Sequence, residues 1–161
     1  MVQITIRKGK RSDSAEFLNL VEELAKFEKL APPNDAAKRR LIRDIFIKRR
    51  LSLLVALVDG ELVGYALYYF TYSSFLAKPT LYLEDLFIKD NHRRRGIGTK
   101  LFFECVKKAK KLGCGRMEWA VLNWNKKAIK FYEGIGARRL TEWYTFRLDE
   151  QTMENLGESF S

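Results

Sequence analysis

The feature that most constrains the fold of this chain is an apolar strand pattern that runs directly into a basic, glycine-spaced turn. Residues 81–88 read Leu-Tyr-Leu-Glu-Asp-Leu-Phe-Ile, and residues 91–99 read Asn-His-Arg-Arg-Arg-Gly-Ile-Gly-Thr. Apolar side chains then recur at helical spacing, at Ile97, Leu101, Phe102, Cys105, Ala109 and Leu112. Gly113 can cap this helix. The sequence therefore predicts a strand, a tight turn and a long amphipathic helix.

The turn between this strand and this helix is suited to bind a phosphate. The first turn of a helix leaves backbone N–H groups without partners and carries the positive end of the helix dipole. Gly96 and Gly98 have no Cβ, so an anion can approach the amides of residues 94–99 closely. We therefore predict an anion site there. The alternative is that the glycines only form the turn and the arginines are solvated.

Two better-known phosphate motifs are excluded by residue order. A Walker loop ends in Gly-Lys-Ser/Thr, whereas residues 98–100 read Gly-Thr-Lys. A dinucleotide fingerprint requires a glycine at position 101, where this chain has Leu101. Neither nucleotide-binding fold fits the pattern.

Length and composition predict one globular domain over residues 1–161, because 47% of the residues are hydrophobic. No apolar run approaches the roughly 18 residues of a membrane span, and the first residues do not read as a signal peptide. We therefore expect a cytoplasmic protein. The two cysteines, Cys105 and Cys114, make no disulfide framework, so we expect free thiols.

The net charge of +10 suits nucleic acid, an anionic membrane surface or a small polyanionic cofactor as a partner. The basic residues are spread over several segments instead of one stripe, at residues 39–40, 48–50, 93–95 and 107–111. We therefore expect several solvated faces and one anion site, with no nucleic-acid partner and no membrane partner.

The remaining elements alternate along the chain. Strands are expected at residues 3–7, 51–58, 61–72, 81–88, 116–122 and 141–148. Helices are expected from Ser12 or Asp13 to the Pro32-Pro33 pair, from Asp35 to Ile47, and from Asn125 to Ile135, while residues 150–161 read as a loose tail. Asp59-Gly60 predicts a tight hairpin. The fold class is α/β (α+β), with a mixed sheet covered by helices on both faces.

A second motif follows the strand expected at residues 116–122. There an asparagine opens a helix that carries a Phe-Tyr pair and is followed by Gly-Ala. Combined with the spacing Arg-x-x-Gly-x-Gly in the phosphate turn, this pattern resembles the GNAT superfamily of acetyl-CoA-dependent N-acetyltransferases, over about residues 4–149. The residues that carry the resemblance are Arg93, Gly96, Gly98, Asn125, Phe131, Tyr132, Gly136 and Ala137.

Within that superfamily, residues 23–28, 68–72 and 82–85 look like the spermidine/spermine N1-acetyltransferase branch, which includes diamine and thialysine acetylating relatives. The resemblance implies a GNAT-like sheet with a splayed pair of parallel strands. It also implies acetyl-CoA as the co-substrate without a metal, a small-molecule amine as the acceptor, and a homodimer.

The resemblance assigns a role to each matching residue. Strand backbone groups that hold the pantetheine arm are expected from Leu86, Phe87 and Ile88. The pyrophosphate is expected at Arg94, Arg95, Gly96, Ile97, Gly98 and Thr99, and Arg93 is also expected to bind the cofactor. The far side of the cofactor is expected to contact Asn125, Lys126, Lys127 and Ala128. The acceptor amine is expected to bind Phe27, Glu28, Glu84 and Glu142.

Acetyl transfer needs a neutral amine and a protonated leaving group. A polyamine nitrogen has a pKa near that of lysine, about 10.4, so a base must take its proton at neutral pH. Glu84 is the expected base, through a water, whereas strand alternation places Asp85 on the opposite face. Tyr132 is the expected proton donor to the CoA thiolate. The amine then attacks directly, without a covalent enzyme intermediate.

Other functions remain open from the sequence. A covalent route through Cys105 would need His92, which precedes the phosphate turn while Cys105 lies far along an apolar helix face. We therefore expect no such route and no role for His92. The acceptor could instead be a protein lysine or N-terminus. A basic nucleic-acid-binding module and a CoA-binding regulator without catalysis are the alternatives from other classes.

Overall fold

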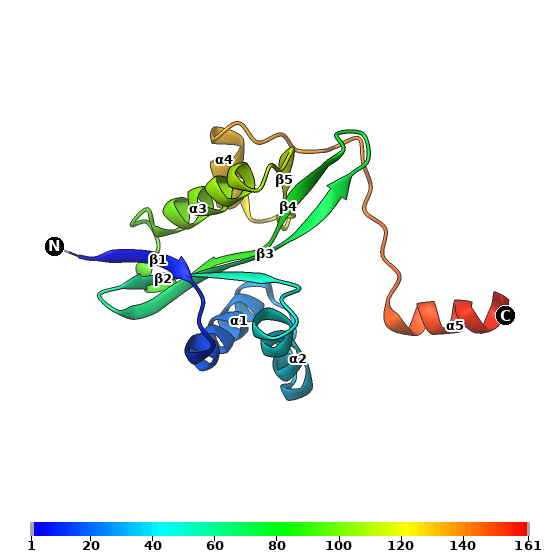
Figure 1. The fold of residues 1–161 in the computed structure, drawn as a ribbon, viewed down its shortest axis with the longest axis horizontal. Helices are drawn as coiled ribbons and strands as arrows, with labels where there is room; N and C mark the ends of the chain where they lie inside the picture. The colour runs from blue at the N-terminus through cyan, green and yellow to red at the C-terminus, as the bar shows by residue number, and fades with distance from the viewer. Residues whose placement is uncertain (1, 161) are drawn as a thin grey trace. The chain divides into compact units, whose positions relative to one another are not determined.

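The computed structural model describes residues 2–160 and contains one five-stranded mixed sheet (Figure 1). The strands lie in chain order, as β1 (Ile4–Lys8), β2 (Ser52–Val58), β3 (Glu61–Ser73), β4 (Lys78–Ile88) and β5 (Arg116–Glu118). Neighbouring strands from β1 to β4 are antiparallel, whereas β4 and β5 are parallel. The predicted mixed sheet is therefore confirmed.

The predicted hairpin joins β2 and β3. Val58 pairs with Glu61, and the two residues between them, Asp59 and Gly60, have φ angles of 48° and 88°. Positive φ at both positions is the requirement of a tight I′-type turn, which glycine and aspartate satisfy at low cost. The Asp59 carboxylate also accepts a hydrogen bond from the backbone N–H of Gln3 at 2.9 Å. The turn thus ties the start of the chain to the sheet.

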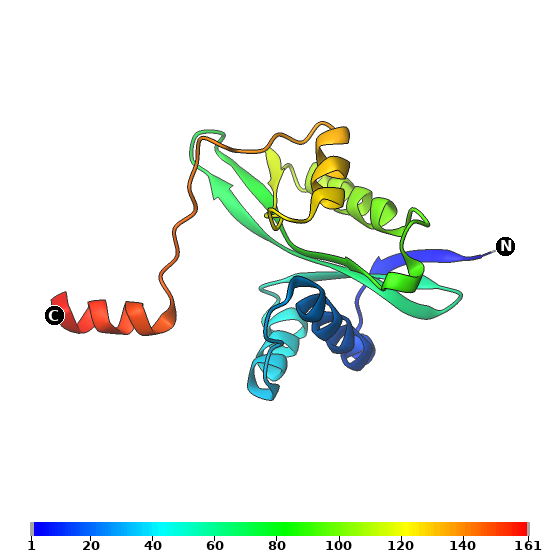
Figure 2. The ribbon, with the colours of Figure 1, turned by 180° about the vertical axis from the view of Figure 1, so that it is seen from behind.

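Helices cover both faces of this sheet, as the views from the two sides show (Figures 1 and 2). α1 (Ser14–Glu28) and α2 (Asp35–Phe46) lie on one face, and α3 (Ile97–Lys111) lies on the other. Between α1, α2 and the sheet is the main core, made by Phe17, Leu20, Leu24, Ile45, Leu53, Val55, Leu62, Tyr65, Leu67 and Phe87. The Phe17 and Tyr65 rings meet edge to face at 4.9 Å, which fixes α1 on β3.

α3 has the amphipathic character that the sequence predicts. Five of its apolar positions are buried: Ile97, Leu101, Phe102, Cys105 and Ala109. Leu112, expected on the same face, is instead 53% exposed because the helix ends just before it. Gly113 has a φ of 70° and Cys114 donates to the carbonyl of Ala109, so the predicted glycine cap is confirmed.

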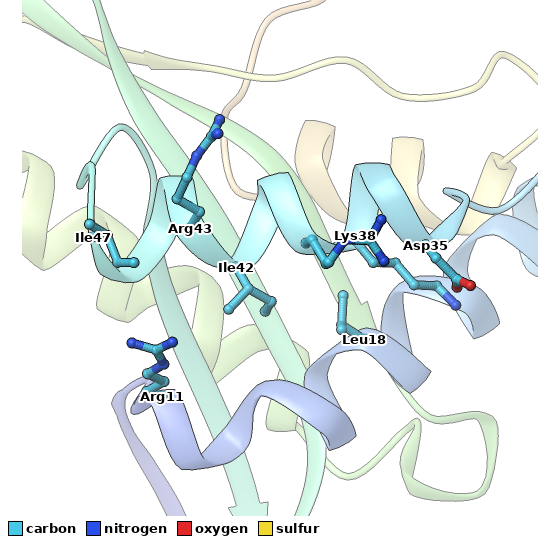
Figure 3. Close-up of a pocket in the computed structure, with 8 residues that line it drawn as sticks. Arg11, Leu18, Asp35, Lys38, Ile42, Arg43 and Ile47 are labelled. Atoms are coloured by element: carbon cyan, nitrogen blue, oxygen red, sulfur yellow. The ribbon is translucent and has the colours of Figure 1, made fainter.

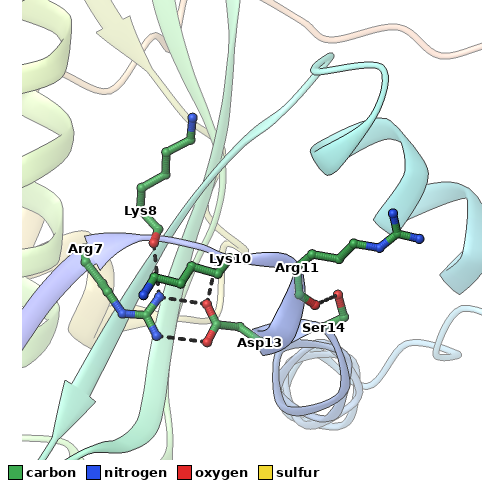
Figure 4. A network of polar contacts seen from close by, with 6 residues as sticks. All are labelled: Arg7, Lys8, Lys10, Arg11, Asp13 and Ser14. Atoms are coloured by element: carbon green, nitrogen blue, oxygen red, sulfur yellow. Dashed lines mark hydrogen bonds and ion pairs between the residues drawn. The ribbon is translucent and has the colours of Figure 1, made fainter.

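The start of α1 is fixed by a polar network where β1 enters the helix (Figure 4). The Asp13 carboxylate accepts bonds from both terminal nitrogens of Arg7, at 2.8 and 2.9 Å, and from the Lys10 backbone N–H at 2.7 Å. The Arg7 guanidinium holds the pKa of Asp13 below its usual value. Asp13 thus links β1 to α1. Its side chain makes no capping hydrogen bond to α1, although the sequence predicts a cap at Ser12 or Asp13.

Helix ends in the first half depart slightly from the expectation. α1 ends at Glu28, before Pro32-Pro33, because Lys29 adopts a left-handed conformation with a φ of 60°. Asn34 caps α2, since its side-chain oxygen accepts from the N–H of Ala37 at 2.9 Å.

The second half of the chain contains three corrections. β5 spans three residues instead of the predicted 116–122. Residues 141–148, predicted to be a strand, form neither helix nor strand, and Trp143, Tyr144 and Phe146 are exposed. Their alternating pattern was misleading because a strand also requires a neighbour with which to pair. Residues expected as a loose tail instead form α5 (Glu150–Phe160), which begins where the Asp149 side chain accepts from the N–H of Thr152 at 2.8 Å.

The chain divides into two compact units at the boundary between Ala120 and Val121. The first unit contains the sheet with α1, α2 and α3, and the second contains α4 (Lys126–Gly134) and α5. The predicted helix from Asn125 is confirmed, with Asn125 itself as the cap. Among residues 2–160, no helix combines the length and the apolar character needed to cross a bilayer.

Candidate functional site

The candidate site is built on the turn that joins β4 to α3. A 3-10 turn, Asp90–His92, follows β4, and then Arg94 and Gly96 adopt positive φ angles of 63° and 72°. The first N–H of this region that bonds within the helix is that of Lys100, to the carbonyl of Gly96 at 3.0 Å. Within residues 2–160, no backbone hydrogen bond uses an N–H of residues 94–99. Six consecutive amides thus have no backbone partner, which suits an anion, and the phosphate site there stays a prediction.

The side chain of Arg93, the residue before these amides, is held by contacts of its own. Its Nε donates to the carbonyl of Ile88 at 2.9 Å and one terminal nitrogen pairs with Asp90 at 3.0 Å. The guanidinium lies 4.7 Å above the Phe27 ring and 5.3 Å from that of Phe87. The structure therefore brings Phe27, predicted for the acceptor, together with three residues predicted for the cofactor. The cofactor role of the Arg93 side chain itself stays a prediction.

The parallel strands β4 and β5 separate early. β4 pairs with β3 as far as Ile88 but with β5 only from Thr80 to Tyr82, opposite Arg116 to Glu118. Among the residues that the structure describes, the β5 side of β4 has no strand partner over residues 83–88, which include the predicted pantetheine contacts Leu86, Phe87 and Ile88. The predicted splay is confirmed, and it begins sooner than expected because β5 is short.

A β-bulge in β4 turns two consecutive acidic side chains toward the same face. Leu67 pairs with Asp85 and Tyr68 pairs with Leu83, so Glu84 is the extra residue. The Tyr65 hydroxyl donates to Asp85 at 3.1 Å, and the Tyr69 hydroxyl donates to Glu84 at 3.3 Å. Tyr65 and Tyr69 lie four residues apart on β3 and share its α1 face. The prediction that Asp85 points away from Glu84 is therefore wrong, because the bulge interrupts the alternation.

These carboxylates form an acidic cluster with Glu28 at the end of α1. Burial raises the pKa of Asp85 to about 6, with further upward contributions from the charges of Glu84 and Glu28, while the Tyr65 hydrogen bond opposes them. Burial and the Glu84 charge also raise the pKa of Glu28. Such a cluster attracts a cationic amine and can accept a proton near neutral pH. Sequence reasoning identified Glu28 and Glu84 and missed Asp85 and the two tyrosines.

The other predicted site residues lie in the second unit. Asn125 accepts from the N–H of Ala128 at 3.3 Å, and Lys126 donates to the carbonyl of Asn123 at 2.9 Å, while Lys127 is exposed. The Tyr132 ring packs against Phe131 with centroids 5.3 Å apart. An ion pair with Arg138 at 2.8 Å lowers the pKa of Glu142. The roles of these residues stay predictions.

The described part of the chain contains no site suited to cysteine or metal chemistry. Cys105 and Cys114 are free thiols, and burial raises the pKa of Cys105 to about 12, which disfavours the nucleophilic thiolate. His92 bonds its neighbour Asn91 at 2.8 Å. Within residues 2–157, whose side chains the structure describes, no group of three or more His, Cys, Asp or Glu could hold a metal ion.

Comparison with known proteins adds an independent observation. A family model described as the acetyltransferase (GNAT) family matches residues 18–137. A thialysine N-epsilon-acetyltransferase of Sus scrofa is 37% identical, with 98% of this chain and 99% of the relative covered. An L-ornithine N5-acetyltransferase of Arabidopsis thaliana is 43% identical over 62% of this chain and 44% of its own length.

A spermidine/spermine N(1)-acetyltransferase-like protein of Homo sapiens is 33% identical over 94% of this chain and 23% of the relative. Among solved structures, an aminoglycoside N-acetyltransferase in complex with CoA shares the fold, with a TM-score of 0.77, 20% identity, and coverage of 93% of this chain and 97% of that one.

Proposed function

Because this chain belongs to the GNAT family of acetyltransferases, we propose that it transfers the acetyl group of acetyl-CoA to a primary amine of a small polyamine, diamine or amino acid. The observation that carries this proposal is the acidic cluster of Glu28, Glu84 and Asp85 beside the open side of β4, close in sequence to the free amides of residues 94–99. An anionic co-substrate and a cationic acceptor thus each have a matching site.

The co-substrate is expected to bind as an added strand along β4. Its pantetheine amides would pair with the backbone groups of Leu86, which face the open side of β4, whereas alternation turns those of Phe87 toward β3. The carbonyl of Ile88 already accepts a hydrogen bond from Arg93, so it would bind the pantetheine arm and Arg93 together. The pyrophosphate would lie on the amides of residues 94–99, with Arg94 and Arg95 adding charge. Asn125, Lys126, Lys127 and Ala128 would contact the far side.

The reaction we propose is direct. The acceptor nitrogen attacks the thioester carbonyl, the C–N bond forms and the C–S bond breaks. The proton lost from the amine passes to Glu84, through a water, and Tyr132 donates its phenolic proton to the departing thiolate. Asp85 supports this step because its carboxylate adds negative charge beside Glu84, which stabilises the cationic acceptor before it loses its proton.

The relatives support an amine carried by a small molecule. Their names include thialysine, ornithine and spermidine/spermine as acceptors, which share a primary amine on a flexible aliphatic chain. Acetylation of protein lysines or N-termini is the second candidate. A cytoplasmic location, one domain over residues 1–161 and a homodimer stay predictions, as does the absence of nucleic-acid, membrane and metal partners.

The experiment that tests the mechanism is substitution of the proposed acid. Tyr132→Phe should lower kcat by about 10²-fold or more while leaving the KM for acetyl-CoA within about twofold, because the hydroxyl acts only on the leaving thiolate. Tyr144→Phe is the matched control: Tyr144 lies in the same unit, is 88% exposed, and should leave both constants unchanged. An unaltered kcat in Tyr132→Phe would remove Tyr132 from the mechanism.

A further inference from the structure

A hollow in the first unit is lined by none of the residues proposed for acetyl transfer. It has a volume of about 480 Å³ and lies between α1 and α2 (Figure 3). The lining residues, here called the α1–α2 groove, are Arg11, Leu18, Asp35, Lys38, Arg39, Ile42, Arg43 and Ile47. None of these is a predicted site residue, so a role of the groove would not depend on the proposed function.

The floor of the groove is apolar and its rim is cationic. Leu18 and Ile42 pack against the main core with one side and face each other across the groove with the other (Figure 3). Ile47 lies near one end and is 58% exposed. Four of the eight lining residues are basic and one is acidic. An apolar floor beside several cations is complementary to an occupant that carries both apolar side chains and negative charge.

Two of these cations have no ion-pair partner within the described residues. Lys38 pairs with Glu22 of α1, and Arg43 pairs with Asp44 at 3.1 Å. Arg11 and Arg39 form no ion pair among the residues that the structure describes. Residues 34–50 carry seven Lys or Arg and two Asp in total, so the surrounding field is also positive. An occupant with negative charge would therefore be attracted to the groove.

The openness of the groove identifies the class of occupant. The groove is more open than enclosed, whereas small-molecule sites enclose about 70–90% of their ligand. No aromatic side chain lines the groove, although unpaired nucleic-acid bases usually stack on aromatics. A second copy presenting the same surface would oppose cations to cations. From Asp35 to Ile47 the helical rise is about 18 Å, enough for roughly three turns of a partner helix.

We propose that the α1–α2 groove binds an acidic amphipathic helix of a protein partner. Its apolar side chains would contact Leu18, Ile42 and Ile47, in the manner of a helix laid into a hydrophobic groove. Its carboxylates would reach Arg11 and Arg39, whose planar guanidinium groups can each donate two hydrogen bonds to one carboxylate. The groove would thus connect the enzyme to other proteins without occupying its acceptor site.

The test uses the full chain and a fluorescein-labelled peptide of about 14 residues, with Leu at helical spacing and Glu elsewhere, in anisotropy titrations. Replacing Arg11 and Arg39 together by Ala should weaken binding about tenfold or more. The matched control replaces Arg40 and Arg49, which are exposed, basic and outside the groove, and should change affinity less than about threefold. Ile47→Ser should weaken binding about fivefold, and circular dichroism should show that all variants stay folded.

Several results would overturn the proposal. Equal losses in the groove pair and the control pair would mean that only general charge attracts the peptide. Equal affinity of a peptide that contains Glu but no Leu would show that the apolar floor does not contribute to binding. Single-stranded RNA that binds more tightly and depends on Arg11 and Arg39 would assign the groove to nucleic acid. Self-association of the chain that the same two substitutions abolish would assign it to a second copy.

Discussion

The partly buried carboxyl of Asp85 gives the sharpest prediction of this structure. Its pKa is raised from an ordinary 3.8 to about 6, so the folded protein holds a proton that the unfolded chain releases. The contribution of Asp85 to stability is therefore fully present below about pH 4 and is lost as the pH rises through about 6, because the folded state must then carry a buried charge. Each pKa unit corresponds to about 1.4 kcal/mol, so the free energy of unfolding can fall by at most about 3 kcal/mol when Asp85 ionises. Remaining solvent contact reduces the expected loss to about 1–3 kcal/mol.

The substitution Asp85→Asn isolates this contribution. The amide oxygen can still accept from the Tyr65 hydroxyl, while no charge forms at any pH. We expect equal urea stability of the two proteins near pH 4, and an advantage of about 1–3 kcal/mol for the variant at pH 8. Taking the difference between the two proteins cancels the titration of all other groups. A difference that is flat with pH, or a variant that is less stable at pH 8, would refute the reasoning.

Three further substitutions test other parts of the structure. Gly64→Ala would place a Cβ against Ile88 and 2.7 Å from a backbone oxygen, so urea unfolding should show a loss of about 1–3 kcal/mol, and an unchanged midpoint would contradict the packing. Asp13→Asn should lose about 1–2 kcal/mol at pH 7, and this loss should shrink as the pH falls below 3.8, because acid protonates wild-type Asp13 and weakens its bond to Arg7; a loss that persists in acid would argue against the ion pair. Gly96→Ala strains a φ of 72° by about 1 kcal/mol and should raise the KM for acetyl-CoA roughly fivefold, whereas an unchanged KM would place the phosphate elsewhere.

Local signals in the sequence were sufficient to predict the hairpin and the helix that form the framework of the first unit. The Asp59-Gly60 turn fixes a hairpin because few other pairs tolerate two positive φ angles. The spacing from Ile97 to Ala109 places one helix face on the sheet, and the glycines of the phosphate turn mark its start. These features depend only on residues that are neighbours in the chain, so they can be predicted from a single sequence.

Features that depend on distant partners were not predictable in the same way. The bulge at Glu84 arises from how β4 pairs with β3, and no residue within β4 marks it. Alternation therefore assigned Asp85 to the wrong face. Residues 141–148 alternate like a strand, yet pairing decides whether a strand forms. The cap at Asp149, which begins α5, was a local signal that the sequence did contain and that was overlooked.

Amine-dependent release of CoA thiol from acetyl-CoA, with product masses, tests the central claim most directly. The panel should contain thialysine, ornithine, lysine, putrescine, spermidine, spermine and a lysine-containing peptide. We predict thiol release with at least one free small amine, a product carrying one acetyl group, and a large loss of rate in Glu84→Gln. Acetylation of the peptide alone would contradict the small-molecule acceptor, and absence of thiol release with every amine would contradict the enzyme itself.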